Sequence, residues 1–335
     1  MTKQWRTLWG VCALLAVLLS AGCAGMRHGD SGWKEEDPKL KVAATLFPYY
    51  DFARQIAGDA ADLTLVIPAG MDSHSFEPTP ADMRTIQEAD VLICNGGAME
   101  HWVDQVLEAI DAPDLTVVTM MDYADAVEEE MVEGMEAEAH EHAHGHAHEH
   151  EQDGHAFEIE YDEHIWTSPV NAMEFTRVIA DTLIREDPAN RQRYEAGRDA
   201  YLEQLYELHQ EFLQVVRNEK RDIIVVGDRF PFRYLAEEYG LRYRAAFSGC
   251  STDTEPSAKT IAYLIDKVRE EEIPAVYYLE LSSHRVSEII GEETGAQPLL
   301  LHSCHNVTRR EFEDGVTYLE LMKGNVENLR KGLDE

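Results

Sequence analysis

Histidine and acidic residues alternate in one internal stretch of the chain, and this pattern is able to bind metal. Residues 128–163 contain fourteen carboxylates, seven histidines and no Lys or Arg. The stretch has too few apolar residues to form a core, but imidazole and carboxylate groups hold borderline divalent cations. We therefore predict an accessory metal-binding tract. Its histidines are His140, His142, His144, His146, His148, His150 and His155.

Composition leaves alternatives for this tract open. Imidazole suits zinc, copper, nickel and iron alike. A solvated acidic linker that happens to contain histidine would look similar, whereas a purification tag fits less well because Ala, Gly and Glu interrupt the run. Residues 140–144 also match the His-Glu-x-x-His pattern of zinc hydrolases, but no apolar face is present there to fix a helix.

A second set of polar residues is scattered along the chain, close to the ends of predicted strands. Open α/β sheets bind their ligands at the carboxyl ends of their strands, so two facing lobes would bring this set into one cleft. A single histidine is usually an ordinary polar residue, and it is the shared placement that predicts a metal site. The set comprises His74, His164, Asp228, Glu280, His302 and His305.

The elements that must position these residues alternate between short apolar runs and amphipathic helical patterns, which is typical of parallel sheets covered by helices. We predict an α/β fold with two lobes, residues 39–168 and 220–335, in which the tract forms a loop at about 124–160. Helices in 169–219 link the lobes, and an unbroken pattern over 191–218 predicts one rigid helix of roughly 42 Å. The predicted strands are 41–46, 62–67, 91–94, 115–119, 222–226, 241–245, 275–279 and 298–301.

The N-terminal residues predict export. Lys3 and Arg6 precede an apolar stretch at 8–19, which is typical of a signal peptide spanning 1–22 and is too short for a membrane span. Ser-Ala-Gly before Cys23 resembles a lipobox, although Ser20 stands where an aliphatic residue is usual. We expect lipidation at Cys23, a tether over 23–38 and a location outside the cell membrane or in the periplasm. A plain signal peptide is the alternative.

Charge and cysteine content agree with an exported cation-binding protein. A formal net charge of −35 argues against nucleic acid and anionic lipid surfaces as partners. Three cysteines remain after Cys23, too few for a disulfide scaffold. We predict a buried thiol at Cys94 and a possible disulfide between Cys250 and Cys304, with three free cysteines as the alternative.

Several segments together resemble a known family. Residues 70–80 (GMDSHSFEPTP), 95–102 (NGGAMEHW), the histidine tract and 164–172 (HIWTSPVNA) follow one another in the order found in the zinc- and manganese-binding lipoproteins of bacterial ABC importers. The resemblance implies two α/β lobes bridged by a long helix. It also implies one metal held between the lobes and delivered to a membrane permease that works with an ATPase.

The resemblance implies metal ligands at His74 and His164. The family usually has a third histidine where this chain has Gly227, which offers no side chain. Our hypothesis is that His302 or His305 replaces this ligand, with Asp228 or Glu280 as an oxygen ligand or supporting partner. Glu100 and His101 are weaker candidates.

The ligand types favour zinc. Three imidazoles with one oxygen or water suit tetrahedral zinc, whereas a manganese site would use more carboxylates. We therefore predict a zinc-capturing component of an importer, not an enzyme, in which the tract collects zinc for the cleft. A manganese-binding relative, a surface adhesin or metal buffer, and an exported hydrolase are the alternatives. Deletion of residues 128–155 is expected to slow loading without changing the number of metals in the cleft.

Overall fold

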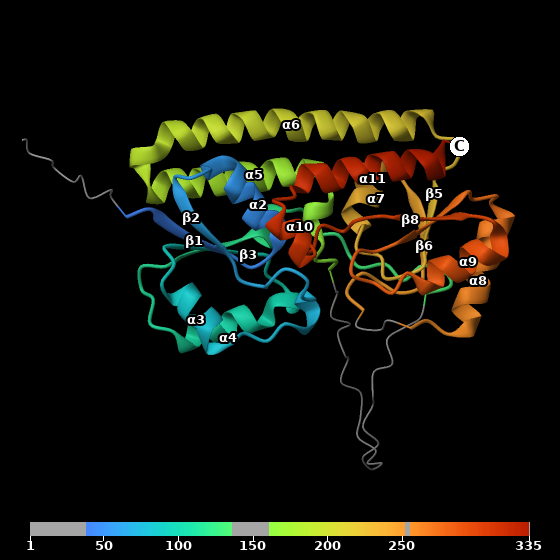
Figure 1. Ribbon diagram of the computed structural model, residues 1–335, viewed down its shortest axis with the longest axis horizontal. Helices are drawn as coiled ribbons and strands as arrows, with labels where there is room; N and C mark the ends of the chain where they lie inside the picture. Colours follow the sequence, from blue (N-terminus) through green and yellow to red (C-terminus); the bar gives the residue numbers. More distant parts are fainter. Residues whose placement is uncertain (1–37, 136–160, 252–254, 335) are drawn as a thin grey trace, which may run out of the picture. The chain divides into compact units, whose positions relative to one another are not determined.

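The computed structural model describes residues 38–135, 161–251 and 255–334. Within these ranges the chain forms two four-stranded sheets, and every strand pair in them is parallel. Helices flank both sheets, as Figure 1 shows. The predicted fold class is therefore confirmed.

The first sheet has the strand order β2-β1-β3-β4. Its register pairs Leu40 with Ala61 and Val42 with Val91. Its strands are β1 (Leu40–Ala44), β2 (Ala61–Leu65), β3 (Val91–Cys94) and β4 (Thr116–Thr119). All four residues of β3 are buried, as expected for a strand at the centre of a sheet covered on both faces.

The second sheet repeats this arrangement with the order β6-β5-β7-β8. Its strands are β5 (Ile223–Val226), β6 (Arg242–Ala245), β7 (Ala275–Tyr278) and β8 (Gln297–Leu300). The sequence predicts all eight strands in the right order, and the observed boundaries differ from the predicted ones by no more than two residues.

The helices begin at recognisable signals. Thr79 forms a capping box with Asp82 at the start of α3, and Ser168 caps α5 with Pro169 in the first turn. The α-helices are α2 (Phe47–Ala57), α3 (Pro80–Gln87), α4 (His101–Ala109), α5 (Pro169–Glu186), α6 (Arg191–Asn218), α7 (Arg233–Tyr239), α8 (Ala258–Glu270), α9 (Arg285–Thr294), α10 (Arg309–Glu313) and α11 (Tyr318–Leu333). The 3-10 helices are η1 (Ser73–Ser75), η2 (Ala98–Glu100), η3 (Met120–Tyr123), η4 (Ile165–Thr167) and η5 (Pro188–Asn190).

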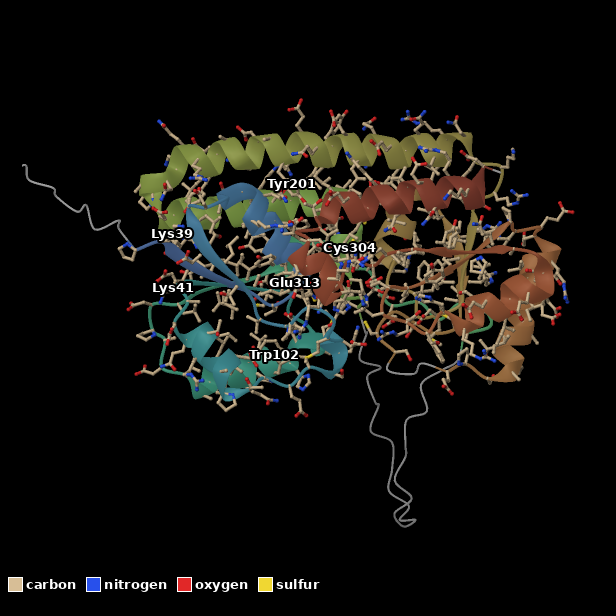
Figure 2. The ribbon with its side chains drawn as sticks, in the orientation of Figure 1. Lys39, Lys41, Trp102, Tyr201, Cys304 and Glu313 are labelled. Carbon is tan, nitrogen blue, oxygen red and sulfur yellow. The ribbon has the colours of Figure 1, made fainter. Side chains whose placement is uncertain are left out.

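Helix α6 has the predicted bounds and passes along both sheets, packed against α5 and α11 (Figure 1). Tyr201 lies on α6 (Figure 2), and its ring centroid is 6.0 Å from that of Phe52 in α2. Further along the same helix, Phe212 stacks on Tyr239 of α7 at 5.0 Å. One rigid helix therefore contacts the helices of both lobes. Among the described residues, no helix is both long and apolar enough to span a bilayer.

Candidate metal centre

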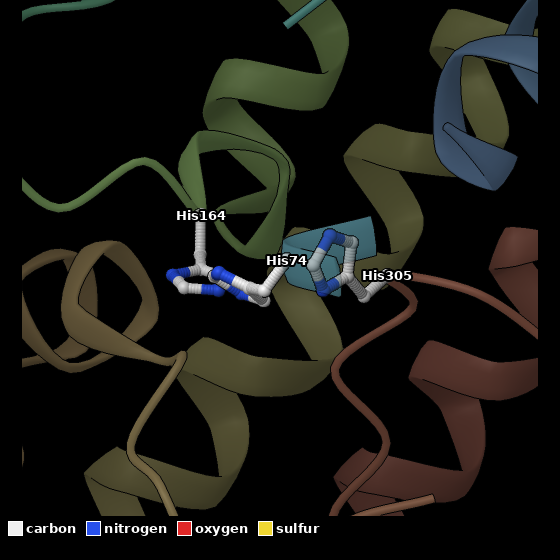
Figure 3. A group of neighbouring side chains, drawn as sticks. All are labelled: His74, His164 and His305. Carbon is white, nitrogen blue, oxygen red and sulfur yellow. The ribbon is translucent and has the colours of Figure 1, made fainter. Parts of the chain in front are cut away.

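Three of the predicted ligands lie together. One ligand atom each from His74, His164 and His305 falls within 4.8 Å of the others. The ring centroids are 5.2–5.6 Å apart, and Figure 3 shows the three imidazoles side by side on three separate segments. Three imidazole nitrogens with space for one more ligand match the donor set of tetrahedral zinc.

His74 lies in η1, in the loop that follows β2. The Asp72 side chain accepts a hydrogen bond from the backbone N–H of His74 at 2.9 Å and so caps this short helix. Asn306, the neighbour of His305, donates to the carbonyls of Pro68 and Met71 at 2.9 and 2.8 Å. The loop that carries His74 is therefore fastened directly to the loop that carries His305.

His164 directly precedes η4 and is buried. One oxygen of Asp162 lies 2.8 Å from the His164 backbone nitrogen and 3.1 Å from its ring Nδ1. A carboxylate at Nδ1 fixes the orientation of the ring and leaves Nε2 for a metal. Asp162 thus holds the His164 imidazole ready for coordination.

His305 lies in the loop after β8, against two residues of the first lobe. The ring of Trp166 is 5.0 Å from the His305 ring and 5.4 Å from the His164 ring. The Trp166 indole N–H donates to the carbonyl of Ser303 at 2.8 Å, and the Ser73 hydroxyl contacts Nε2 of His305. Trp166 therefore forms a buried wall that links two of the three histidines.

The histidines border a cavity of about 330 Å³ between the two lobes. Arg229, in the loop after β5, forms an ion pair with Asp72 across this cavity at 3.2 Å. The same Asp72 caps the helix of His74. One carboxylate therefore both links the two lobes and helps to place His74.

Burial and nearby groups favour the neutral, cation-binding form of His74 and His305. Burial, and then the nearby His164 and Arg229, lower the pKa of His74 to about 3. Burial also holds the pKa of His305 well below its usual value, with His74 and His164 contributing. Both rings are therefore neutral at physiological pH, which is the form that coordinates metal.

Gly227, where the family resemblance implies a third histidine, has little space for a side chain. A side chain at Gly227 would place its Cβ 2.5 Å from the Ser287 hydroxyl. His305 joins the cluster from the other loop, whereas His302 does not. The Nδ1 atom of His302 accepts a hydrogen bond from the Cys304 backbone N–H at 2.9 Å, so this imidazole is directed into its own loop.

The two predicted acidic partners line the cavity but do not join the histidine cluster. Glu280 accepts hydrogen bonds from the Ser303 backbone, at 2.8 Å, and from the Ser303 hydroxyl. Asp228 accepts from the backbone of Arg229 at 2.8 Å. Burial raises the pKa of Asp228, against the effect of that hydrogen bond. Through its hydrogen bonds with Ser303, Glu280 thus stabilises the loop that carries His305.

The weaker candidates have structural roles or lie apart. Glu100 is buried and accepts the backbone N–H groups of Asn95 and Gly96 at 2.6 and 3.1 Å. His101 is exposed and outside the cluster.

The predicted cysteine pair is not formed. Cys250 and Cys304 are both free, as is the buried Cys94. Cys304 lies fully buried beside His302, whereas the backbone N–H of Cys250 faces Glu129. Cys23 and the seven tract histidines, from His140 to His155, lie outside the described residues.

The residues that hold the histidines in place were not among those predicted from the sequence. Asp162 and Trp166 flank His164 in the sequence, and an acidic residue two positions before a predicted ligand is a usable signal for a partner. The pairing of Arg229 with Asp72 joins residues 157 positions apart and has no such signal.

Known proteins with similar sequences include zinc-uptake and zinc-binding proteins. The chain is 33% identical over 334 residues to the high-affinity zinc uptake system protein ZnuA of Bacillus subtilis, covering 99% of each chain. It is 30% identical over 321 residues to the zinc-binding lipoprotein AdcA of Streptococcus pneumoniae, covering 96% of this chain but 61% of AdcA.

Solved structures give the same result. The Zn(II)-bound ZnuA-like domain of Streptococcus pneumoniae AdcA is similar with a TM-score of 0.70 and 28% identity, over 89% of this chain and 100% of that one. The metal-dependent lipoprotein YcdH of Bacillus subtilis is similar with a TM-score of 0.71 and 28% identity, over the same shares. Residues 42–332 match the family described as "Zinc-uptake complex component A periplasmic", and the chain belongs to this family.

Proposed function

We propose that this protein captures zinc outside the cytoplasm and delivers it to the permease of an ABC importer. The observation that carries the proposal is the meeting of His74, His164 and His305, which come from both lobes, within 4.8 Å. Capture and release of an ion require no bond to be made or broken, so the protein acts without catalysis.

Zinc fits this site better than manganese does. Among the described residues, the group whose ligand atoms all lie within 4.8 Å of one another consists of three imidazoles and includes no carboxylate, and Asp162 contacts Nδ1 of His164 instead. Neutral nitrogen ligands suit zinc, whereas manganese favours oxygen ligands. Copper and nickel also accept imidazole, and a competition series with all four ions tests the selectivity.

We further propose that Cys23 carries a lipid anchor after removal of residues 1–22. The anchor would hold the binding lobes beside the permease and its ATPase, and the tract that begins after residue 135 would raise the local zinc concentration. Mass spectrometry of the mature N-terminus tests the anchor directly.

Growth under zinc starvation tests the importer role. A deletion strain should grow poorly when zinc is scarce and recover when zinc is added. The wild-type gene should restore growth, and His164→Gln should not. Normal growth of the deletion strain in scarce zinc would instead support a surface adhesin, a metal buffer or an exported hydrolase.

A further inference from the structure

Residues 124–135, which we call the strap, leave η3 of the first lobe and lie against the second lobe. The Tyr243 hydroxyl donates to Glu130 at 3.2 Å, and the Cys250 backbone N–H donates to Glu129 at 3.1 Å. Gly134 lies against α8 so closely that an added Cβ would be 2.1 Å from the ring of Tyr263. The strap is therefore a further connection between the lobes, in addition to α6 and the contacts around the histidine cluster.

The strap and the segment that precedes His164 are joined by backbone pairing and by one side-chain hydroxyl. The Tyr234 hydroxyl of α7 donates to the Asp162 carbonyl at 2.7 Å and accepts the Val127 backbone N–H at 3.2 Å. The Asp162 backbone N–H donates in turn to the Val127 carbonyl at 2.9 Å. These three hydrogen bonds form a closed ring that joins the strap, α7 and the residue that orients His164.

The position of His164 thus depends on the second lobe. In the sequence, His164 is attached to the first lobe through η4 and α5. Its ring nevertheless takes its orientation from Asp162, whose backbone is held by Tyr234. A Cβ at Gly249, also in the second lobe, would lie 2.8 Å from the Asp162 carboxylate, so little space remains for that side chain to move.

We propose that Tyr234 and the strap are positioning elements that preorganise His164 for zinc. The proposal rests on the zinc site proposed above. A ligand held in its bound position before the metal arrives loses less conformational freedom on binding, and this gain appears as affinity. The strap also lets the second lobe, which supplies His305 to the cluster, act on His164 of the first lobe.

Replacing one hydroxyl tests this role. In the full mature chain, Tyr234→Phe should weaken zinc binding about fivefold, the factor that one net hydrogen bond carries. The visible spectrum of the protein loaded with Co²⁺ should also change, because the spectrum reports the arrangement of the imidazoles. Tyr239→Phe is the matched control, because it removes another buried hydroxyl from α7, one bonded to His209 at 3.0 Å.

The two variants separate positioning from stability. Tyr239→Phe should leave the cobalt spectrum and the zinc affinity unchanged, even where its melting temperature falls. A Tyr234→Phe protein with wild-type spectrum and affinity would overturn the positioning role while leaving the zinc site itself intact. A wild-type protein that binds no zinc would instead contradict the proposed function.

A second pair tests the strap. Gly134→Ala should push the strap away from Tyr263 and weaken zinc binding in the same direction as Tyr234→Phe. Met131→Ser alters an exposed strap residue and should have no effect. Equal affinities for these two variants would remove the strap from the proposal and leave Tyr234 alone.

Discussion

His302 and His305 lie three residues apart in the loop after β8. The backbone conformation between them directs their side chains to different places. Cys304 adopts a left-handed conformation with φ 59°. Its N–H binds the ring of His302, so that ring faces the loop, while His305 reaches the cluster. A left-handed φ is uncommon for a residue other than glycine, and such strain is often found at functional loops.

Substituting the two histidines separately should give different results. His305→Gln should weaken zinc binding by more than about tenfold, because loss of even a supporting partner costs at least that much. His302→Gln should leave the affinity within about threefold, since its imidazole lies outside the group of three histidines. Competition with a coloured zinc chelator measures both, and the opposite ranking would place the ligand at His302.

The neutral cluster also predicts how the zinc-free protein responds to acid. The pKa of His74 is about 3 in the folded chain, below the ordinary value near 6.5 in the unfolded chain. The unfolded state therefore binds more protons as pH falls from 6.5 towards 3, and folded stability decreases through that window.

Substituting His74 tests this source of acid sensitivity. His74→Gln should reduce the slope of stability against pH, measured by urea unfolding in a metal chelator between pH 7.5 and 4. Parallel curves for the variant and the wild type would show that the acid sensitivity comes from other groups.

At the scale of elements, a glycine lets α6 lie close to α2. A Cβ at Gly197 would lie 2.2 Å from the Ile56 carbonyl oxygen. Gly197→Ala should therefore destabilise the protein by about 1–3 kcal/mol, the usual cost of overpacking. The general helix preference for alanine predicts the opposite sign.

Gly324 in α11 provides the matched control. It has no atom within 4 Å of an added Cβ, and Gly324→Ala should stabilise by up to about 1 kcal/mol. Chemical unfolding of both variants measures the difference. Stabilisation by both would mean that α6 is free to move away from α2.

The ion pair between Arg229 and Asp72 should slow zinc release, because it holds the lobes together across the cavity. Asp72 is partly exposed, so the expected effect is modest, less than about fivefold. Arg229→Gln and Asp72→Asn should each speed zinc dissociation, and the double variant should be no faster than the single ones. Arg285→Gln removes the same charge from the cavity wall and should not speed release.

The strands and helices can be predicted well from the sequence. The contacts that bring distant residues together can be predicted less well. The strands and α6 follow from local apolar patterns such as IIVV at Ile223–Val226, because burial on both faces dictates such runs. The choice of His305 over His302 depends on a single left-handed residue. The contact of Tyr234 with Asp162 joins residues 72 positions apart, and no local pattern specifies it.

At the scale of the whole molecule, the histidine tract and the cleft are covalently joined through the strap. The sequence alone suggests that residues 128–155 form one dispensable loop. However, residues 128–135 belong to the described structure, and within them Glu129, Glu130 and Gly134 contact the second lobe. A deletion that removes the tract without disturbing the cleft should therefore begin at residue 136.

Two deletions should accordingly differ. Loss of 136–155 removes all seven tract histidines and should slow zinc loading at scarce zinc, while one tight site with unchanged affinity remains. Loss of 128–155 also removes the contacts of Glu129, Glu130 and Gly134 with the second lobe. It should weaken the tight site, because the rest of the strap is then no longer fixed against the second lobe where it contacts Asp162. Stopped-flow loading and equilibrium competition on both proteins measure the two effects separately. If the longer deletion kept the wild-type affinity, the strap would be a passive linker. Neither the strap nor the tract would then contribute to zinc affinity in the cleft.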